Sequence, residues 1–204
     1  MSVINFITVH GRRRSRLLSG IFPVILLCLA MAAPLSAGGP DHRAETARGL
    51  VKTFAGELGM KLKTALGEGG AVEAIRVCNV VAPDIADRLS TEHDWHIART
   101  SLQPRNTDNA PDDWEAAVLR DFDERLRNGE AIKDMEYFAE VATEDGTLFR
   151  YMKPIPTQGL CLTCHGSDID PVVQSEISRL YPDDRATGYR MGDIRGAFTL
   201  SRLH

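Results

Sequence analysis

The stretch MEYFAEVATEDGTLFRYMK, residues 135–153, decides the fold of this chain. Met135–Ala142 and Thr147–Lys153 have the composition of strands, and Asp145-Gly146 between them is a strong hairpin signal. The sequence therefore predicts two antiparallel strands joined by a tight turn. At least part of the domain is then an antiparallel sheet.

Two further segments extend the predicted sheet, and two prolines limit it. Trp95–Ser101 reads as a short strand, and a last strand is expected to begin after Gly192-Asp193. Pro154 and Pro156 are expected to end the second hairpin strand, because proline cannot donate to a sheet ladder. Four strands are predicted in all.

Amphipathic helices surround these strands. Apolar residues recur at spacings of three and four over His42–Leu66 and, after a pair of glycines, over Ala71–Leu89. Two more helices are expected over Asp112–Leu126 and from Pro171 to Tyr181, the latter with an aspartate as its capping residue. Helices combined with an antiparallel sheet predict a single α+β domain.

The N-terminal segment is expected to be a secretory signal peptide. Residues 1–37 contain four arginines, no acidic residue, an apolar run over Ile21–Ala33 and small residues around Ala37. A retained membrane anchor is the alternative, but the apolar run is short and contains a proline. We therefore expect cleavage after Ala37, a folded domain over residues 38–204 with no membrane span, and a periplasmic location.

The charge of the chain limits its partners. It has 24 basic and 28 acidic side chains, a formal net charge of −4, and cleavage of the arginine-rich leader would make the mature domain more acidic. An acidic surface disfavours nucleic acids and anionic membranes as partners. It fits docking onto a basic patch of another protein.

The residues Cys161-Leu162-Thr163-Cys164-His165 form a haem-attachment motif. Two thiols at this spacing can add to the two vinyl groups of a haem, and the histidine that follows can ligate the iron. The motif predicts one covalent haem c, with thioether links to Cys161 and Cys164 and His165 as the proximal ligand. Gly159 and Gly166 are expected to let the backbone approach the macrocycle closely.

Two other interpretations of the motif are a redox dithiol and half of a zinc site. A redox dithiol usually opens a helix after a buried strand of a thioredoxin-like unit, which the predicted order of elements lacks. A zinc site needs a fourth ligand and usually a second pair of ligands. Both interpretations fit the sequence less well than haem does.

The second axial ligand is left open by the spacing. Cys78 lies on the apolar face of the second helix, and Pro83 is expected to kink or restart that helix just after it, since proline cannot donate to the carbonyl of Asn79. Cys78 is the odd cysteine of the exported domain, although a lone cysteine on such a face is often a small buried hydrophobe. The other candidates are His93, His96, Met135, Met152 and Met191.

Basic residues could pair with the haem propionates. The arginines in segments that could approach a haem are Arg99, Arg105, Arg150, Arg190 and Arg195. Arg99, Arg105 and Arg195 are the candidate propionate contacts. The alternative is that these side chains are solvated.

Several stretches of the sequence resemble one known family when they are taken together. They are Ala74–Cys78 with Ala82-Pro83, Arg99–Ser101 with Pro104–Asn106, Pro111–Glu115, the haem motif with Gly166, Tyr181–Tyr189 and Gly192–Ala197. The chain resembles the single-haem c-type family of unassigned physiological role that has a PAS-like fold and also occurs as the sensing portion of bacterial signalling proteins.

The resemblance implies a central antiparallel sheet with flanking helices, and haem ligation by His165 and Cys78. A PAS-like sheet usually has five strands, one more than the sequence predicts. We expect no output segment after His204, so the resemblance to the signalling members is not expected to extend to an output in the same polypeptide.

Two functions compete at this point. The first is a redox or diatomic-gas sensor, in which reduction weakens the bond to Cys78, opens a site for CO or NO and is relayed to a signalling partner. The second is a periplasmic electron carrier that docks on a redox partner. An enzymatic role as a peroxidase or nitrite reductase would need a placed acid or base, and the pair His93 and His96 beside Trp95 is more typical of a structural surface segment. We therefore expect no enzymatic activity.

Overall fold

The computed structural model describes residues 41–204, so the predicted signal peptide over residues 1–37 lies outside the described residues. In this part of the chain four strands form one antiparallel sheet in the order β1-β4-β3-β2. The strands are β1 His96–Thr100, β2 Tyr137–Thr143, β3 Gly146–Pro156 and β4 Ile194–Leu203. All four correspond to predicted strands.

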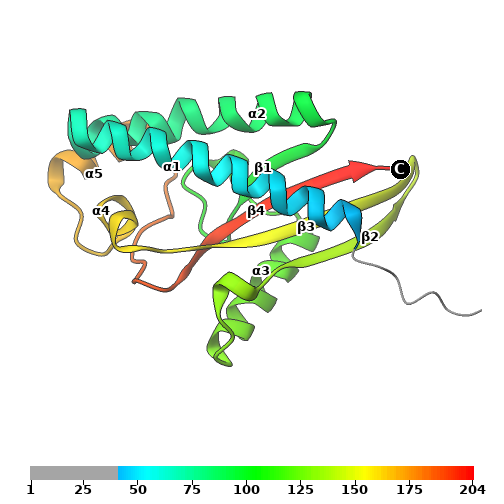
Figure 1. Cartoon of the computed structure of the whole chain (residues 1–204). Coiled ribbons are helices and arrows are strands. Elements are labelled where there is room, and N and C mark those ends of the chain that lie inside the picture. Colours follow the sequence, from blue (N-terminus) through cyan, green and yellow to red (C-terminus); the bar gives the residue numbers. More distant parts are fainter. Residues whose placement is uncertain (1–40) are drawn as a thin grey trace, which may run out of the picture. The chain divides into compact units, whose positions relative to one another are not determined.

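Helices cover both faces of the sheet (Figure 1). The long helix α1, His42–Arg76, and α2, Ala82–His93, lie over one face, and α3, Asp113–Arg127, lies over the other. The short α4, Leu162–His165, and α5, Pro171–Leu180, lie near the far end of α1. None of the helices within residues 41–204 is both long and apolar enough to cross a membrane.

The alternation of side chains along the strands produces two cores. Toward α1 and α2, Phe149 and Tyr151 of β3 pack with Leu200 of β4 and with Phe54 of α1, whose ring lies 5.2 Å from that of Phe198. Toward α3, the apolar residues are Val118, Leu119, Phe122, Met135, Met152, Ile194 and Ala197. The face directed at α1 and α2 also carries the candidate site.

The hairpin prediction is confirmed, but the expected end of its second strand is wrong. Strand β3 continues through Pro154 and Pro156, which pair with β4 opposite Ala197 and Ile194. Strand β2 reaches only as far as Met152 on the other side of β3. Beyond that point no strand of residues 41–204 pairs with this side of β3, and proline is tolerated at such an unpaired strand edge.

The long helical region is interrupted at two points, both predicted. Gly70 has φ 69° and ψ −163°, a conformation that favours glycine, and it kinks α1. After Arg76 the chain forms a π-helical turn over Val77–Val81, in which the Ala82 N–H donates to the carbonyl of Val77 five residues back. Pro83 then occupies the first turn of α2. The break therefore falls on the turn that contains Cys78.

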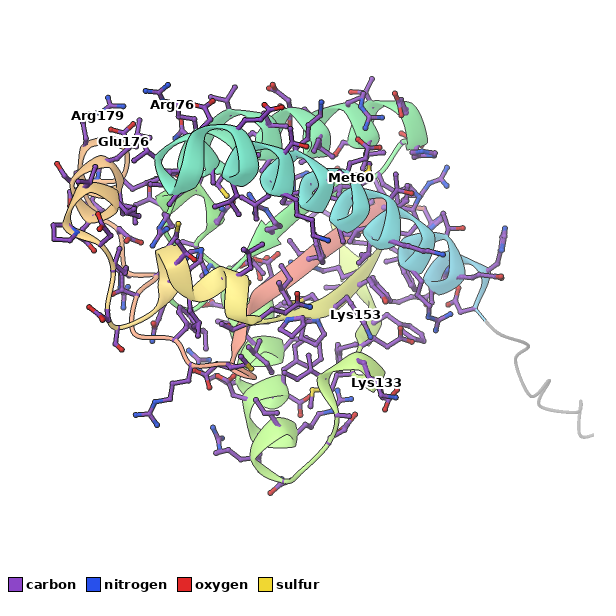
Figure 2. All side chains as sticks on the ribbon, turned by 60° about the vertical axis from the view of Figure 1, so that its left-hand side comes forward. Met60, Arg76, Lys133, Lys153, Glu176 and Arg179 are labelled. Atoms are coloured by element: carbon purple, nitrogen blue, oxygen red, sulfur yellow. The ribbon has the colours of Figure 1, made fainter. Side chains whose placement is uncertain are left out.

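Helix α5 is fixed against the end of α1. Asp170 caps α5 by accepting from the Val172 N–H at 2.8 Å, as predicted. A third apolar cluster joins the two helices through Ile75, Val173, Ile177 and Tyr181. On the surface, Glu176 lies beside both Arg179, at 2.8 Å, and Arg76, at 3.9 Å (Figure 2). This packing holds the segment that contains α4 against α1.

Candidate functional site

A cavity of about 410 Å³ lies between the helices α1 and α2, the sheet and α4. Its volume is within the range of about 300–1,000 Å³ that is usual for ligand pockets. Cys78, Cys161, Cys164 and His165 all line it. The cavity therefore brings together the attachment motif and a cysteine from a distant part of the sequence.

The helical wall of the cavity is apolar. Helix α1 contributes Phe54, Leu58, Leu62 and Leu66, which recur every four residues on one face, as the amphipathic pattern predicts. Phe54 is fully buried, whereas the three leucines are half-buried. Ile75 also lines the wall near the end of α1. These side chains form a surface suited to a flat apolar ligand.

The attachment motif is helical. A 3₁₀ turn over Gly159–Cys161 leads directly into α4, which lies beneath α1 in both views (Figures 1 and 2). Positions 161 and 164 are three residues apart and therefore share one face of this helical turn. Cys161 and Cys164 are free thiols in the structure, as is Cys78.

The two glycines beside the motif have local roles. A Cβ at Gly166 would lie 2.7 Å from the carbonyl oxygen of Leu162, so the end of α4 requires the glycine. A Cβ at Gly159 would meet only the terminal methyl of Met191, at 3.5 Å. The expectation that both residues serve the approach of a macrocycle has no support in these contacts.

His165 lies between the Ala186 carbonyl and the guanidinium of Arg195, whose Nε is 3.2 Å from Nδ1 and 3.5 Å from Nε2 of the imidazole. Its Nδ1 lies 2.8 Å from the carbonyl oxygen of Ala186, and since a carbonyl only accepts, Nδ1 carries the hydrogen. Burial, with the positive charges of Arg195 and Arg105, lowers the pKa of His165 to about 2. The imidazole is therefore neutral, and the lone pair on Nε2 is the one that could ligate a metal.

Cys78 lies in the π-helical turn between α1 and α2. Burial raises the pKa of its thiol, and the charges of Arg99, Arg105 and Arg195 act in the opposite direction. The thiol is thus favoured by its desolvation, while the thiolate is favoured by three guanidinium groups.

The structure sorts the candidates for the second axial ligand. Cys78 and His96 line the cavity. Met135 and Met152 are fully buried in the core on the opposite face of the sheet. The remaining two, His93 and Met191, are exposed and are not among the lining residues.

The five arginines are also separated by the fold. Arg99, Arg105 and Arg195 line the cavity. Arg150 projects toward α3, where it lies 2.7 Å from Asp112 and stacks over Trp114. Arg190 is exposed.

Among the three cavity arginines, one has a carboxylate partner and two do not. Arg105 is buried and pairs with Asp184 at 3.1 Å. Arg99 and Arg195 form no ion pair with any carboxylate of residues 41–204, and burial lowers the pKa of both. Arg99 lies 5.7 Å from the centre of the Phe54 ring, and Arg195 lies 5.2 Å from that of Tyr189.

The zinc interpretation lacks a geometric basis. Within the described residues no group of three or more His, Cys, Asp or Glu side chains is arranged to hold a metal ion. Cys161, Cys164 and His165 come to the cavity from one segment, and Cys78 comes from another. This arrangement suits a ligand larger than a single ion.

Sequence reasoning missed the role of the segment after α5. Asp184 accepts from Arg105, and the carbonyl of Ala186 accepts from both Arg105 and His165. The Tyr189 N–H donates to the carbonyl of His165 at 2.9 Å. Backbone carbonyls carry no signal in the sequence, so only the resemblance, which includes residues 181–189, pointed to this segment.

The fold and site describe a PAS-like α+β domain with a CxxCH motif in an apolar cavity, and the comparisons with known proteins agree. The chain matches the model of the Tll0287-like family, described as Tll0287, over residues 23–202, and it belongs to this family.

A search of the solved structures found the crystal structure of the cyanobacterial heme-protein Tll0287, which is 20% identical to this chain. The match has a TM-score of 0.60 and covers 81% of this chain and 98% of that one. No curated protein matches the chain. The structural match supports the predicted fold, a single domain with a PAS-like antiparallel sheet and flanking helices.

Proposed function

We propose that this chain is a periplasmic haem protein that carries one haem c and acts as a redox or diatomic-gas sensor. Cys161 and Cys164 are the thioether attachment points, and His165 and Cys78 are the axial ligands. The observation that carries the proposal is that these four residues, from two distant segments, line one cavity. The structural relative is itself a heme-protein.

The residues of the cavity fit a haem in three respects. The helical wall is apolar, as a macrocycle requires. His165 has its Nδ1–H engaged by the Ala186 carbonyl, which leaves Nε2 as a ligand. Arg99 and Arg195 are cations without a carboxylate partner in the described chain, and a haem has two propionates.

The three arginines then have different roles. Arg99 and Arg195 are the better propionate ligands, because they are half-buried cations without a counter-charge in the described chain and a bound carboxylate would supply one. The charge of Arg105 is already balanced by Asp184. Haem bound in the cavity would supply one-electron redox chemistry and an iron coordination site whose access depends on its axial ligands.

Cys78 is the residue that favours a sensor. Desolvation raises the pKa of its thiol, so a thiolate that is not held by a metal would take up a proton at Sγ. Cys78 also lies in a π-helical turn, a structure often found at functional sites. Since that turn joins α1 to α2, movement of Cys78 would be passed to both helices and could bias a partner protein.

An electron carrier is the second candidate. The acidic composition of the domain and the exposed Leu160, next to Cys161, suit docking of a redox partner beside the motif. A carrier keeps both axial ligands in both oxidation states. A sensor of the proposed kind loses Cys78 on reduction.

Absorption spectra of the purified protein, oxidised and reduced and with and without CO, test the proposal. We expect thiolate ligation in the oxidised form, CO binding in the reduced form, and loss of the thiolate signature in a Cys78→Ala variant. His96→Ala is the matched control, since His96 is the other axial candidate in the cavity, and its spectra should equal those of the wild type. Exclusion of CO from the reduced wild type but not from Cys78→Ala would favour the carrier.

A further inference from the structure

Arg105 lies in the loop between β1 and α3, yet it contacts the attachment motif directly. Its Nη2 donates to the carbonyl of Cys164 at 2.6 Å and to that of Ala186 at 3.1 Å. Its Nε and Nη2 also donate to the two carboxylate oxygens of Asp184, each at 3.1 Å. The guanidinium thus holds together two segments that are separate in the sequence.

The carbonyl of Ala186 is shared between two donors. It accepts from His165 Nδ1 at 2.8 Å and from Arg105 Nη2 at 3.1 Å. A hydrogen bond from the outer nitrogen of a metal-bound histidine makes the imidazole a stronger electron donor, and more so when its acceptor is electron-rich. A charged second donor on the same oxygen draws electron density away from that acceptor.

Asp184 fixes this arrangement from the other side. Its Oδ1 accepts from the Ala186 N–H at 2.8 Å as well as from Arg105. The Arg185 N–H donates to the carbonyl of Pro104 at 3.0 Å, which fastens the backbone beside Arg105. Arg105 therefore reaches the Ala186 carbonyl in one geometry, and its side chain is only 8% exposed.

We infer that Arg105 is a positioning residue that tunes the proximal ligand: by donating to the Ala186 carbonyl it limits electron donation from His165 and raises the reduction potential. This inference rests on the proposed function, in which His165 ligates the haem. It gives the buried Arg105–Asp184 pair a purpose beyond packing. Arg105 would thus act on the proximal ligand, whereas Arg99 and Arg195 would bind the propionates.

The test uses the full-length, haem-loaded protein and two variants. Arg105→Gln/Asp184→Asn removes one charge of each sign, so the net charge is kept while the charged donor to Ala186 is lost. Asp184→Asn alone keeps Arg105 and removes only its counter-charge. The readout is the midpoint potential, measured by spectroscopic redox titration.

The two variants should shift the potential in opposite directions. The double variant should lower it, because His165 becomes the stronger donor, whereas Asp184→Asn should raise it, because a negative charge near the iron is lost. Outer-shell partners of metal ligands typically change affinity or activity about 10–100-fold. A tenfold change in the equilibrium constant for reduction is about 59 mV for one electron.

A matched control pair lies on the opposite face of the sheet. Arg150→Gln/Asp112→Asn also neutralises a close arginine–carboxylate pair, which is 2.7 Å long and does not contact the motif. It should lower thermal stability without moving the potential. Equal potentials in Arg105→Gln/Asp184→Asn and the wild type, or shifts of the same sign in both Asp184 variants, would overturn the inference.

Absence of covalent haem from the wild-type protein would contradict the proposed function, and this result is distinct from an unchanged potential in the Arg105 variant. Should the double variant not fold, the positive shift expected for Asp184→Asn remains as a test. An unchanged or lowered potential in that variant would then overturn the inference by itself.

Discussion

Replacement of Arg99 or Arg195 by leucine should weaken haem binding and at the same time stabilise the haem-free protein. Both residues are half-buried without a carboxylate partner in the described chain, and desolvation lowers the pKa of each guanidinium. Leucine removes a cation that has no counter-charge in the described chain, so the free energy of unfolding of the haem-free protein should rise, and more for Arg99 than for Arg195, which donates to Ser101 Oγ and to the Gln103 carbonyl.

The loss of haem affinity follows from the hydrogen bonds that each arginine would give to a propionate. A hydrogen bond to a charged group contributes about 1.5–3 kcal/mol, and each 1.4 kcal/mol is a factor of ten, so each substitution should weaken binding about 10–150-fold. The assay is a haem titration of a Cys161→Ser/Cys164→Ser chain, in which binding is reversible. Chemical denaturation of the same haem-free proteins gives the stabilities.

Arg150→Leu is the control for this experiment. Arg150 is paired with Asp112 and Glu115 on the other face of the sheet, so its loss should destabilise the protein and leave haem affinity unchanged. The reasoning is refuted if Arg99→Leu and Arg195→Leu lower the stability of the haem-free protein while haem affinity stays at the level of the parent chain.

Three further predictions concern the haem-free protein. Its free energy of unfolding should fall as the pH drops below about 6.5, by at most about 1.4 kcal/mol per pH unit, because His165 has a pKa of about 2 in the fold and binds a proton more readily when the chain is unfolded. His165→Gln should flatten this pH dependence in denaturation curves taken between pH 4 and pH 7. An equal slope in the variant and the wild type would contradict the prediction. Phe54→Ala should lower the free energy of unfolding by about 3–5 kcal/mol, because the ring is fully buried against Phe198. A decrease below about 1 kcal/mol in urea denaturation would show that the core tolerates the space left by the ring. Gly196→Ala should lower the free energy of unfolding by about 1–3 kcal/mol, since φ is 155° and a Cβ would collide with the Thr100 carbonyl. An unchanged melting temperature would mean that β1 and β4 separate easily at this point.

Much of the fold could be predicted from local patterns. Asp145-Gly146 determined the hairpin, the glycine pair and Pro83 determined the two interruptions of the helical region, and Asp170 determined the start of α5. Each of these features depends on backbone preferences that a residue carries wherever it stands. The full length of β3 could not be predicted, because Pro154 and Pro156 are tolerated only where β2 has already ended.

The candidate site was predictable in its parts but not in its arrangement. The motif identified Cys161, Cys164 and His165 by spacing, and the resemblance favoured Cys78 over the other candidates for the second ligand. Spacing could not show that Met135 and Met152 face the other core, since that depends on the register of the sheet. Nor could it separate Arg105 from Arg99 and Arg195, because the difference lies in Asp184, a partner 79 residues away.

The most direct test of covalent haem attachment is the mass of the denatured protein after expression of residues 1–204 in a host that matures c-type cytochromes. We expect the mass of one haem to stay with the wild-type chain and no haem to stay with Cys161→Ser/Cys164→Ser. A wild-type chain whose mass contains no haem would contradict this expectation.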